Sequence, residues 1–241
     1  MLEAPYMESP LEKRYRMCIN TIYLLFIRLD LSVIGIFNFE GRGFVVSVRK
    51  IGVIVGLLFL SSTVAFSVGA SLIQEFVDGN SNQTSLTIGV LLQIYCGIAI
   101  AGIGILMYPI LKPYNKRLAL GYVSSRVLEF AVITISGIYL LSQLKVVPSY
   151  DLLIYVFTGA GGLILSYLLY VSKLIPRLLS VIGIIGYLLL LIGVLAGVFG
   201  NLDLNTGLGL LFLIPGGLFE ILLPIWLFIK GFKMTASAVT V

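Results

Sequence analysis

The sequence predicts an all-α, polytopic membrane protein: a six-helix transmembrane bundle with short loops and both termini in the cytoplasm. Of its 241 residues, 59% are hydrophobic and only 11% are charged, against about 45 to 50% and about 25% in soluble domains. The mean hydropathy is +1.09. Six apolar runs are long enough to cross a hydrocarbon layer of ~30 Å, which takes ~20 helical residues. These runs do not alternate as barrel strands would, so helices are expected.

The six apolar runs are separated by short polar connectors. In chain order the runs are Ile51–Leu72, Leu86–Leu111, Gly121–Leu144, Leu152–Val171, Leu178–Gly200 and Gly207–Ile229. No connector is long enough for a soluble domain, so any activity lies within the bilayer or at its surfaces. We therefore expect a transmembrane domain at residues 48–233 and a short tail at 234–241.

Residues 1–47 do not fit this pattern. Met17–Phe39 is apolar, but Arg28 and Asp30 lie in its middle, where each costs about 2.5 to 3.5 kcal/mol in a spanning helix. A secretory signal would need a small-residue cleavage site, which is missing nearby. Two interpretations of this N-terminal extension remain: a segment on the membrane surface, or an upstream extension from a miscalled start.

The basic residues indicate the orientation of the helices. One set of helix ends carries Arg42, Arg49, Lys50, Lys112, Lys116, Arg117, Lys173, Arg177, Lys230 and Lys233, whereas the opposite set carries Lys145 alone. Short loops rich in Lys and Arg stay in the cytoplasm, so we expect both termini on the cytoplasmic side of a plasma membrane. This distribution explains the net charge of +5, and we expect membrane lipids as partners and no nucleic acid.

Three charged residues fall well inside the predicted helices: Arg126, Glu129 and Glu220. At about 1.5 Å per residue the two carboxylates lie ~12 and ~15 Å from the cytoplasmic ends, so they can meet at one level. Arg126 shares a helix face with Glu129, and its guanidinium fork can bridge both glutamates. Tyr122 continues that face, and Gln93 is a further polar candidate. Buried charges of this kind usually face a partner or a wet cavity.

The last helix has an unusual backbone. Pro215, Gly216 and Gly217 predict a kink or break, and Pro224 leaves the carbonyl of Glu220 without its helical donor. Interrupted helices of this kind bind ions and polar substrates in transporters.

Glycine and alanine recur on single helix faces, where they allow close helix packing. These positions are Gly52, Gly56, Gly97, Ala101, Gly104, Gly159, Gly162, Gly186, Gly193, Gly197 and Gly200. They predict packing within the chain or a homodimer through the Gly-rich faces.

Two functional hypotheses explain these residues. The first is a small transporter, or a protein that binds lipid or another small ligand, using an Arg126-Glu129-Glu220 cluster. The second is a non-catalytic accessory subunit in which the same charges form a stabilising clasp. Histidine is absent and Cys18 and Cys96 are isolated, so we expect no metal and no cofactor. Intramembrane hydrolysis is a third hypothesis, but no catalytic motif supports it and we do not expect an enzyme.

Three segments resemble a prokaryotic membrane-protein family known as domain of unknown function 4386. They are Tyr108–Phe130, Ser172–Gly193 and Ile214–Phe232. The resemblance extends over about Arg49–Lys233 and leaves the N-terminal extension unmatched. It implies a basic and an acidic residue early in the third helix and an acidic residue in the last, which Arg126, Glu129 and Glu220 match. It implies no activity.

Overall fold

The computed structural model describes residues 48–144, 150–200, 202, 204 and 207–233. Within them the α-helices are α2 (Val48–Val77), α3 (Gln83–Leu111), α4 (Lys116–Gln143), α5 (Tyr150–Ser172), α6 (Arg177–Val198) and α7 (Leu210–Ile229), with a 3₁₀ turn η1 (Gly207–Gly209) before α7. Six helical segments are long and apolar enough to cross a membrane. The predicted six-helix bundle is confirmed, and the protein is a multi-pass membrane protein. The expectations for residues 1–47 and 234–241 lie outside the described residues.

Capping residues place some helix boundaries beyond the apolar runs. Helix α4 begins at Lys116, earlier than the predicted Gly121, because the Asn115 side chain accepts a hydrogen bond from the backbone N–H of Leu118 at 3.0 Å. Asn82 caps α3 in the same way through Ser85, at 3.0 Å. An asparagine at this position satisfies a backbone donor that the first helical turn leaves free. Hydrophobicity alone underestimates the length of such helices, because the residues of their first turn are polar.

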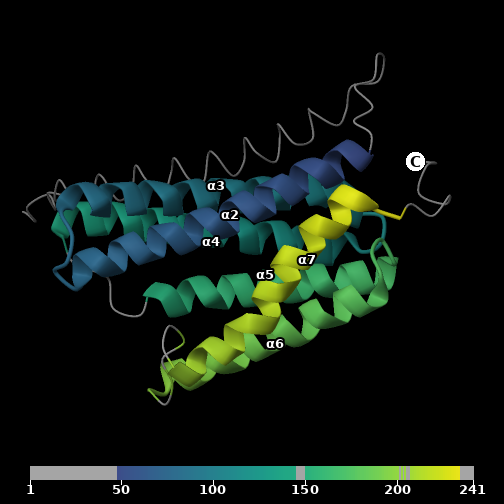
Figure 1. The fold of residues 1–241 in the computed structure, drawn as a ribbon. Coiled ribbons are helices and arrows are strands. Elements are labelled where there is room, and N and C mark those ends of the chain that lie inside the picture. Colours follow the sequence, from purple (N-terminus) through teal and green to yellow (C-terminus); the bar gives the residue numbers. More distant parts are fainter. Residues whose placement is uncertain (1–47, 145–149, 201, 203, 205–206, 234–241) are drawn as a thin grey trace, which may run out of the picture. The chain divides into compact units, whose positions relative to one another are not determined.

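Each helix packs against the next one along the chain, and α7 packs back against α2. Figure 1 shows that α7 crosses the bundle obliquely, from the side of α6 toward the beginning of α2. The glycine contacts follow this path. A Cβ on Gly193 of α6 would lie 3.0 Å from Phe212, near the start of α7, and a Cβ on Gly56 of α2 would lie 2.9 Å from Phe228, near its end. Helix α7 therefore contacts different neighbours along its two halves.

Helix α7 runs without a break at Pro215, Gly216, Gly217 and Pro224, which corrects the predicted break, while a kink at these residues stays a prediction. Both prolines lie inside one continuous α-helix. Each removes only a single backbone donor, and neighbouring helices make such losses tolerable in a membrane helix. Helix α6 packs directly against this segment, since a Cβ on Gly186 would overlap the backbone N of Gly216.

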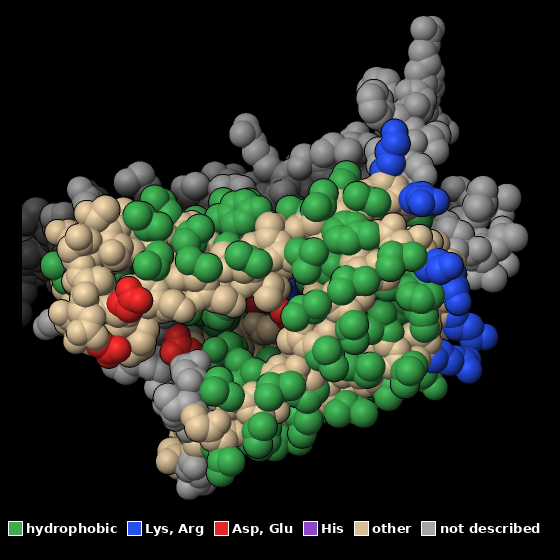
Figure 2. Space-filling view, in the orientation of Figure 1, with side chains coloured by type: hydrophobic (Ala, Val, Ile, Leu, Met, Phe, Trp, Pro, Cys, Tyr) green, Lys and Arg blue, Asp and Glu red, His purple; other side chains and the backbone are tan. Residues whose placement is uncertain are grey.

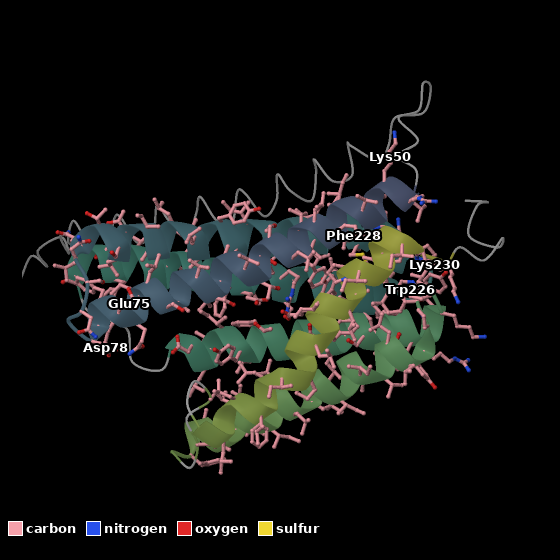
Figure 3. The ribbon with its side chains drawn as sticks, in the orientation of Figure 1. Lys50, Glu75, Asp78, Trp226, Phe228 and Lys230 are labelled. Carbon is pink, nitrogen blue, oxygen red and sulfur yellow. The ribbon has the colours of Figure 1, made fainter. Side chains whose placement is uncertain are left out.

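Apart from Arg126, Glu129 and Glu220, the charged residues of the described helices lie toward the two ends of the bundle. We call the end that carries Lys50 and Lys230 the basic end, and the end that carries Glu75 and Asp78 the acidic end (Figure 3). In Figure 2 the blue side chains gather at the first end, and the face between the ends is largely apolar. Apolar side chains are indeed exposed along the helices, as at Leu57, Leu91 and Leu195. The location of the basic end in the cytoplasm stays a prediction.

Most of the glycines predicted to form packing faces lie inside the chain, whereas Gly200 lies beyond the end of α6 and a Cβ there would meet nothing within 4 Å. A Cβ on Gly69 of α2 would lie 2.8 Å from the carbonyl oxygen of Gly89 on α3, and one on Gly97 would lie 2.8 Å from the ring of Phe130 on α4. These distances are too short for any side chain. Close packing of helices therefore accounts for these glycines, while the homodimer stays a prediction.

Candidate functional site

A cavity of about 270 Å³ lies among the helices and is lined by residues of α2 to α7. Tyr122, Arg126 and Glu129 of α4 line it together with Glu220 of α7. The two carboxylates therefore meet in one site, as their depths in the sequence suggested. Gln93 is buried but lies against Gly69 of α2 and is not among the lining residues.

Arg126 and Glu129 form a buried ion pair that is attached to α5. Arg126 Nη2 lies 3.0 Å from Glu129 Oε2 and donates to the carbonyl oxygens of Phe157 and Thr158 at 2.9 and 3.0 Å. The Thr158 hydroxyl donates to Glu129 Oε1 at 2.6 Å, and the Ser125 hydroxyl donates to the Phe157 carbonyl at 2.8 Å. Hydrogen bonds as well as charge thus hold the pair, although Arg126 Nε and Glu129 Oε2 have no hydrogen-bond partner in the described part of the chain.

Two glycines of α5 create the room for this arrangement. A Cβ on Gly161 would overlap Nη2 of Arg126, and a Cβ on Gly162 would overlap the ring of Tyr187. In a helix the Cβ leans toward the preceding turn, so a side chain at Gly161 would obstruct the approach of Arg126 to the carbonyls of that turn, whereas one at Gly162 would displace Tyr187. The Gly161-Gly162 pair is therefore a requirement of the polar site.

Glu220 has no cationic partner among the described residues. Tyr187 donates its hydroxyl to Glu220 Oε1 at 3.1 Å. Thr63 lies 3.5 Å from Oε2, but its single proton has a shorter acceptor in the Phe59 carbonyl at 3.0 Å, and a hydrogen bond weakens at the longer distance. The predicted bridge from Arg126 to both glutamates is therefore wrong for Glu220. Arg126 makes its ion pair with Glu129.

The lining of the cavity therefore holds one more acidic residue than basic residues. It contains one basic residue, Arg126, and two acidic residues, Glu129 and Glu220. The pair of Arg126 and Glu129 is neutral as a unit, which leaves the carboxyl group of Glu220. The hydroxyl of Tyr122, which is 1% exposed, has no hydrogen-bond partner in the described part of the chain. Buried polar groups without a partner are rare in native proteins, so the lining retains unused hydrogen-bonding capacity.

The cavity also contains open space beside α7. Gly216 and Gly217 both line it, and a Cβ on Gly217 would meet nothing within 4 Å. Pro215 and Pro224 are not among the lining residues. The glycines of this predicted breaking motif therefore widen the cavity, and the helix continues through them.

Three residues beside the carboxylates were not singled out from the sequence: Thr158 and Tyr187, which donate hydrogen bonds to them, and Thr63, which lies 3.5 Å from Glu220 Oε2. Thr63 ends a polar triplet in the middle of α2, and Thr158 precedes a glycine in α5. Tyr187 lies in the middle of α6, away from the membrane interfaces where tyrosine is common. This central position was the signal available in the sequence.

Among the described residues no group of three or more His, Cys, Asp and Glu side chains is placed to hold a metal ion. A family model with the description "Domain of unknown function (DUF4386)" matches residues 51–153 and 149–231, which together span the six helices. No curated protein and no solved structure gives a significant match.

Proposed function

The chain belongs to the family described as Domain of unknown function (DUF4386), and we propose that its cavity binds a small ligand through a cationic, N–H-donating group held by Glu220. The observation that carries this proposal is the position of Glu220 in the cavity without a cationic partner in the described residues. A carboxylate at such depth is expensive unless a positive charge or a proton compensates it. A ligand ammonium group supplies that charge.

The hydroxyl groups of the cavity support the same ligand chemistry. Ser62, Thr63 and Ser67 line one wall. Each donates its proton to a carbonyl of α2, at 2.9, 3.0 and 2.9 Å respectively. A hydroxyl group has one donor and two acceptor sites, so this wall presents lone pairs to the cavity. Acceptors beside a carboxylate suit an ammonium N–H group and repel an anion.

The Arg126-Glu129 pair supports a second, structural role. Its hydrogen bonds to Phe157 and Thr158 connect α4 to α5, as expected of a clasp in an accessory subunit. We assign this role to the pair and the ligand role to Glu220. Among the classes considered from the sequence, this proposal favours small transporters and lipid- or ligand-binding membrane proteins, in a plasma membrane.

The test compares Glu220→Gln with the wild type and with Glu75→Gln, a matched control at an exposed acidic residue. The proteins are purified in mild detergent, and primary alkylamines are titrated while bound adducts are followed by native mass spectrometry. A charge-assisted hydrogen bond contributes about 1.5 to 3 kcal/mol. We therefore expect Glu220→Gln to raise the dissociation constant roughly 10- to 100-fold, and Glu75→Gln to leave it unchanged.

One result would contradict the ligand role of Glu220. If the folded wild type and Glu220→Gln retain amines equally or not at all, the ligand role is wrong. The clasp would then be the better account of all three charges.

A further inference from the structure

The cavity has an opening on its side, between α2 and the first half of α7. The second half of α7 packs on α2, where Phe228 meets Gly56, whereas the first half packs on α6. Near the acidic end, the buried residues of α2, α3 and α4 form a separate cluster, made of Ile73, Leu86, Val90 and Leu140. The helices α2, α3 and α4 thus separate from α5, α6 and α7 toward this end. In Figure 2 charged side chains are visible at the bottom of a hollow in the apolar face.

The surroundings of this opening are apolar, as a lipid-facing surface is. On α2, Val64 and Val68 are 63% and 46% exposed, directly beside the lining residues Thr63 and Ser67. On α7, Ile214 and Leu218 are 58% and 46% exposed beside the lining residues Leu213 and Gly217. Exposed side chains of this kind border on hydrocarbon in a membrane helix. The opening therefore faces the acyl chains of the bilayer.

The size of the cavity suits the polar end of an amphiphile. Sites that enclose a drug-sized ligand measure about 300 to 1,000 Å³, whereas this cavity measures about 270 Å³. Its polar groups lie around Glu220, while Phe66 and Leu213 contribute apolar lining. A headgroup fits inside, and an attached chain would extend through the side opening.

Resting on the function proposed above, we infer that the ligand is a membrane-resident amphiphile whose primary ammonium headgroup enters from the bilayer, between α2 and α7, to reach Glu220. The chain of the amphiphile stays in the lipid. The charge of Arg126 is paired with that of Glu129, so Glu220 is the carboxyl group without an ion-pair partner among the described lining residues. Gly217 lies on the route, since its missing side chain leaves open space beside Glu220.

The test uses photo-crosslinking in phosphatidylcholine vesicles. One probe is a long-chain primary alkylamine with a diazirine next to the ammonium group, and the other is a short, water-soluble primary amine with the same diazirine. Labelled peptides are identified by mass spectrometry. We expect the long-chain probe to label the cavity segments of α2 and α7, and the short probe to label them at least about tenfold less, because each buried CH₂ group adds about 0.8 kcal/mol to membrane partitioning.

Gly217→Leu and its control test the route of entry, and Glu220→Gln tests recognition of the ammonium group. Gly217→Leu fills the space beside Glu220 and should reduce labelling by the long-chain probe about tenfold, which corresponds to about 1.4 kcal/mol. Gly102→Leu is the matched control, since a Cβ at Gly102 meets only Leu58, at 3.7 Å, and should leave labelling unchanged. Glu220→Gln should reduce labelling roughly 10- to 100-fold.

The outcomes separate the two proposals. Equal labelling of the cavity by the short probe, sensitive to Glu220→Gln and insensitive to Gly217→Leu, would overturn the bilayer route and leave the ligand site intact. Labelling by the long-chain probe that ignores Glu220→Gln would overturn recognition by Glu220. Absence of cavity labelling by either probe would overturn both.

Discussion

At the scale of single residues, the two carboxylates of the site differ in their partners. Glu129 is 2% exposed and compensated by Arg126 at 3.0 Å. Glu220 accepts a hydrogen bond from the Tyr187 hydroxyl and forms no ion pair with a described residue. Since a buried ion needs a partner, we propose the structural role for Glu129 and the ligand-binding role for Glu220.

Removing Arg126 alone should damage the protein more than removing the whole pair. Arg126→Met leaves Glu129 buried without its cation, and breaking one partner of a buried pair costs about 3 to 5 kcal/mol. The double variant Arg126→Met/Glu129→Gln removes that unpaired charge, so it should unfold at a higher temperature than Arg126→Met. Thermal unfolding in detergent provides the measurement.

Arg117→Gln is the matched control, because Arg117 is exposed at the basic end. We expect its melting temperature to equal that of the wild type. Equal destabilisation in the single and double Arg126 variants would contradict the structural role of the pair.

At the scale of elements, α7 is held in place by backbone contact with α6. A Cβ on Gly186 would overlap the backbone of Gly216 and Pro215. Backbone atoms cannot rotate away as a side chain does, so the two helices would have to separate. This contact supports α7 beside Pro215, and it places Gly216, Gly217 and Glu220 along the cavity.

We expect Gly186→Ala to destabilise the bundle by about 1 to 3 kcal/mol, the usual penalty of overpacking. Gly121→Ala is the control, since its new Cβ would meet only Ile164, at an ordinary 3.7 Å. That variant should keep or slightly gain stability, because alanine favours the helix more than glycine does. Thermal unfolding of both variants decides the question, and a stable Gly186→Ala protein would refute the close contact.

At the scale of the whole molecule, charge is segregated between two ends and an apolar face connects them. Lys50 and Lys230 lie at one end, and Glu75 and Asp78 lie at the other (Figure 3). The retention of basic loops in the cytoplasm then predicts the orientation of the entire bundle. In that orientation the side opening faces the outer half of the bilayer, because the helices separate toward the acidic end.

This orientation is testable with single cysteines in a Cys18→Ser/Cys96→Ala background. Asp78→Cys and Lys112→Cys each place a thiol at an exposed position, at the acidic and the basic end respectively. On intact cells a membrane-impermeant maleimide should label Asp78→Cys, and it should reach Lys112→Cys only after permeabilisation. The reverse pattern would invert the topology and move the side opening to the inner leaflet.

The membrane-spanning segments and the charged residues inside them could be predicted from the sequence, because each depends only on the residues of one segment. A run of ~20 apolar residues crosses the bilayer wherever it occurs, and Arg126, Glu129 and Glu220 are unusual in any membrane helix. The backbone of α7 differs from the prediction made from its own residues. Its prolines predicted a break, yet the helix is continuous, since α6 packs against it at Gly186.

The six helices and the positions of the charged residues along them follow from each segment's own composition, so they could be predicted before any contact between helices was known. Which charges pair with one another depends on the packing of the helices. Arg126 reaches carbonyls of α5 because Gly161 has no side chain, and Glu220 meets Tyr187 of α6. Pairing depends on which helix faces meet and on the angle at which α7 crosses them. Contacts between distant segments set both, and no single segment encodes them.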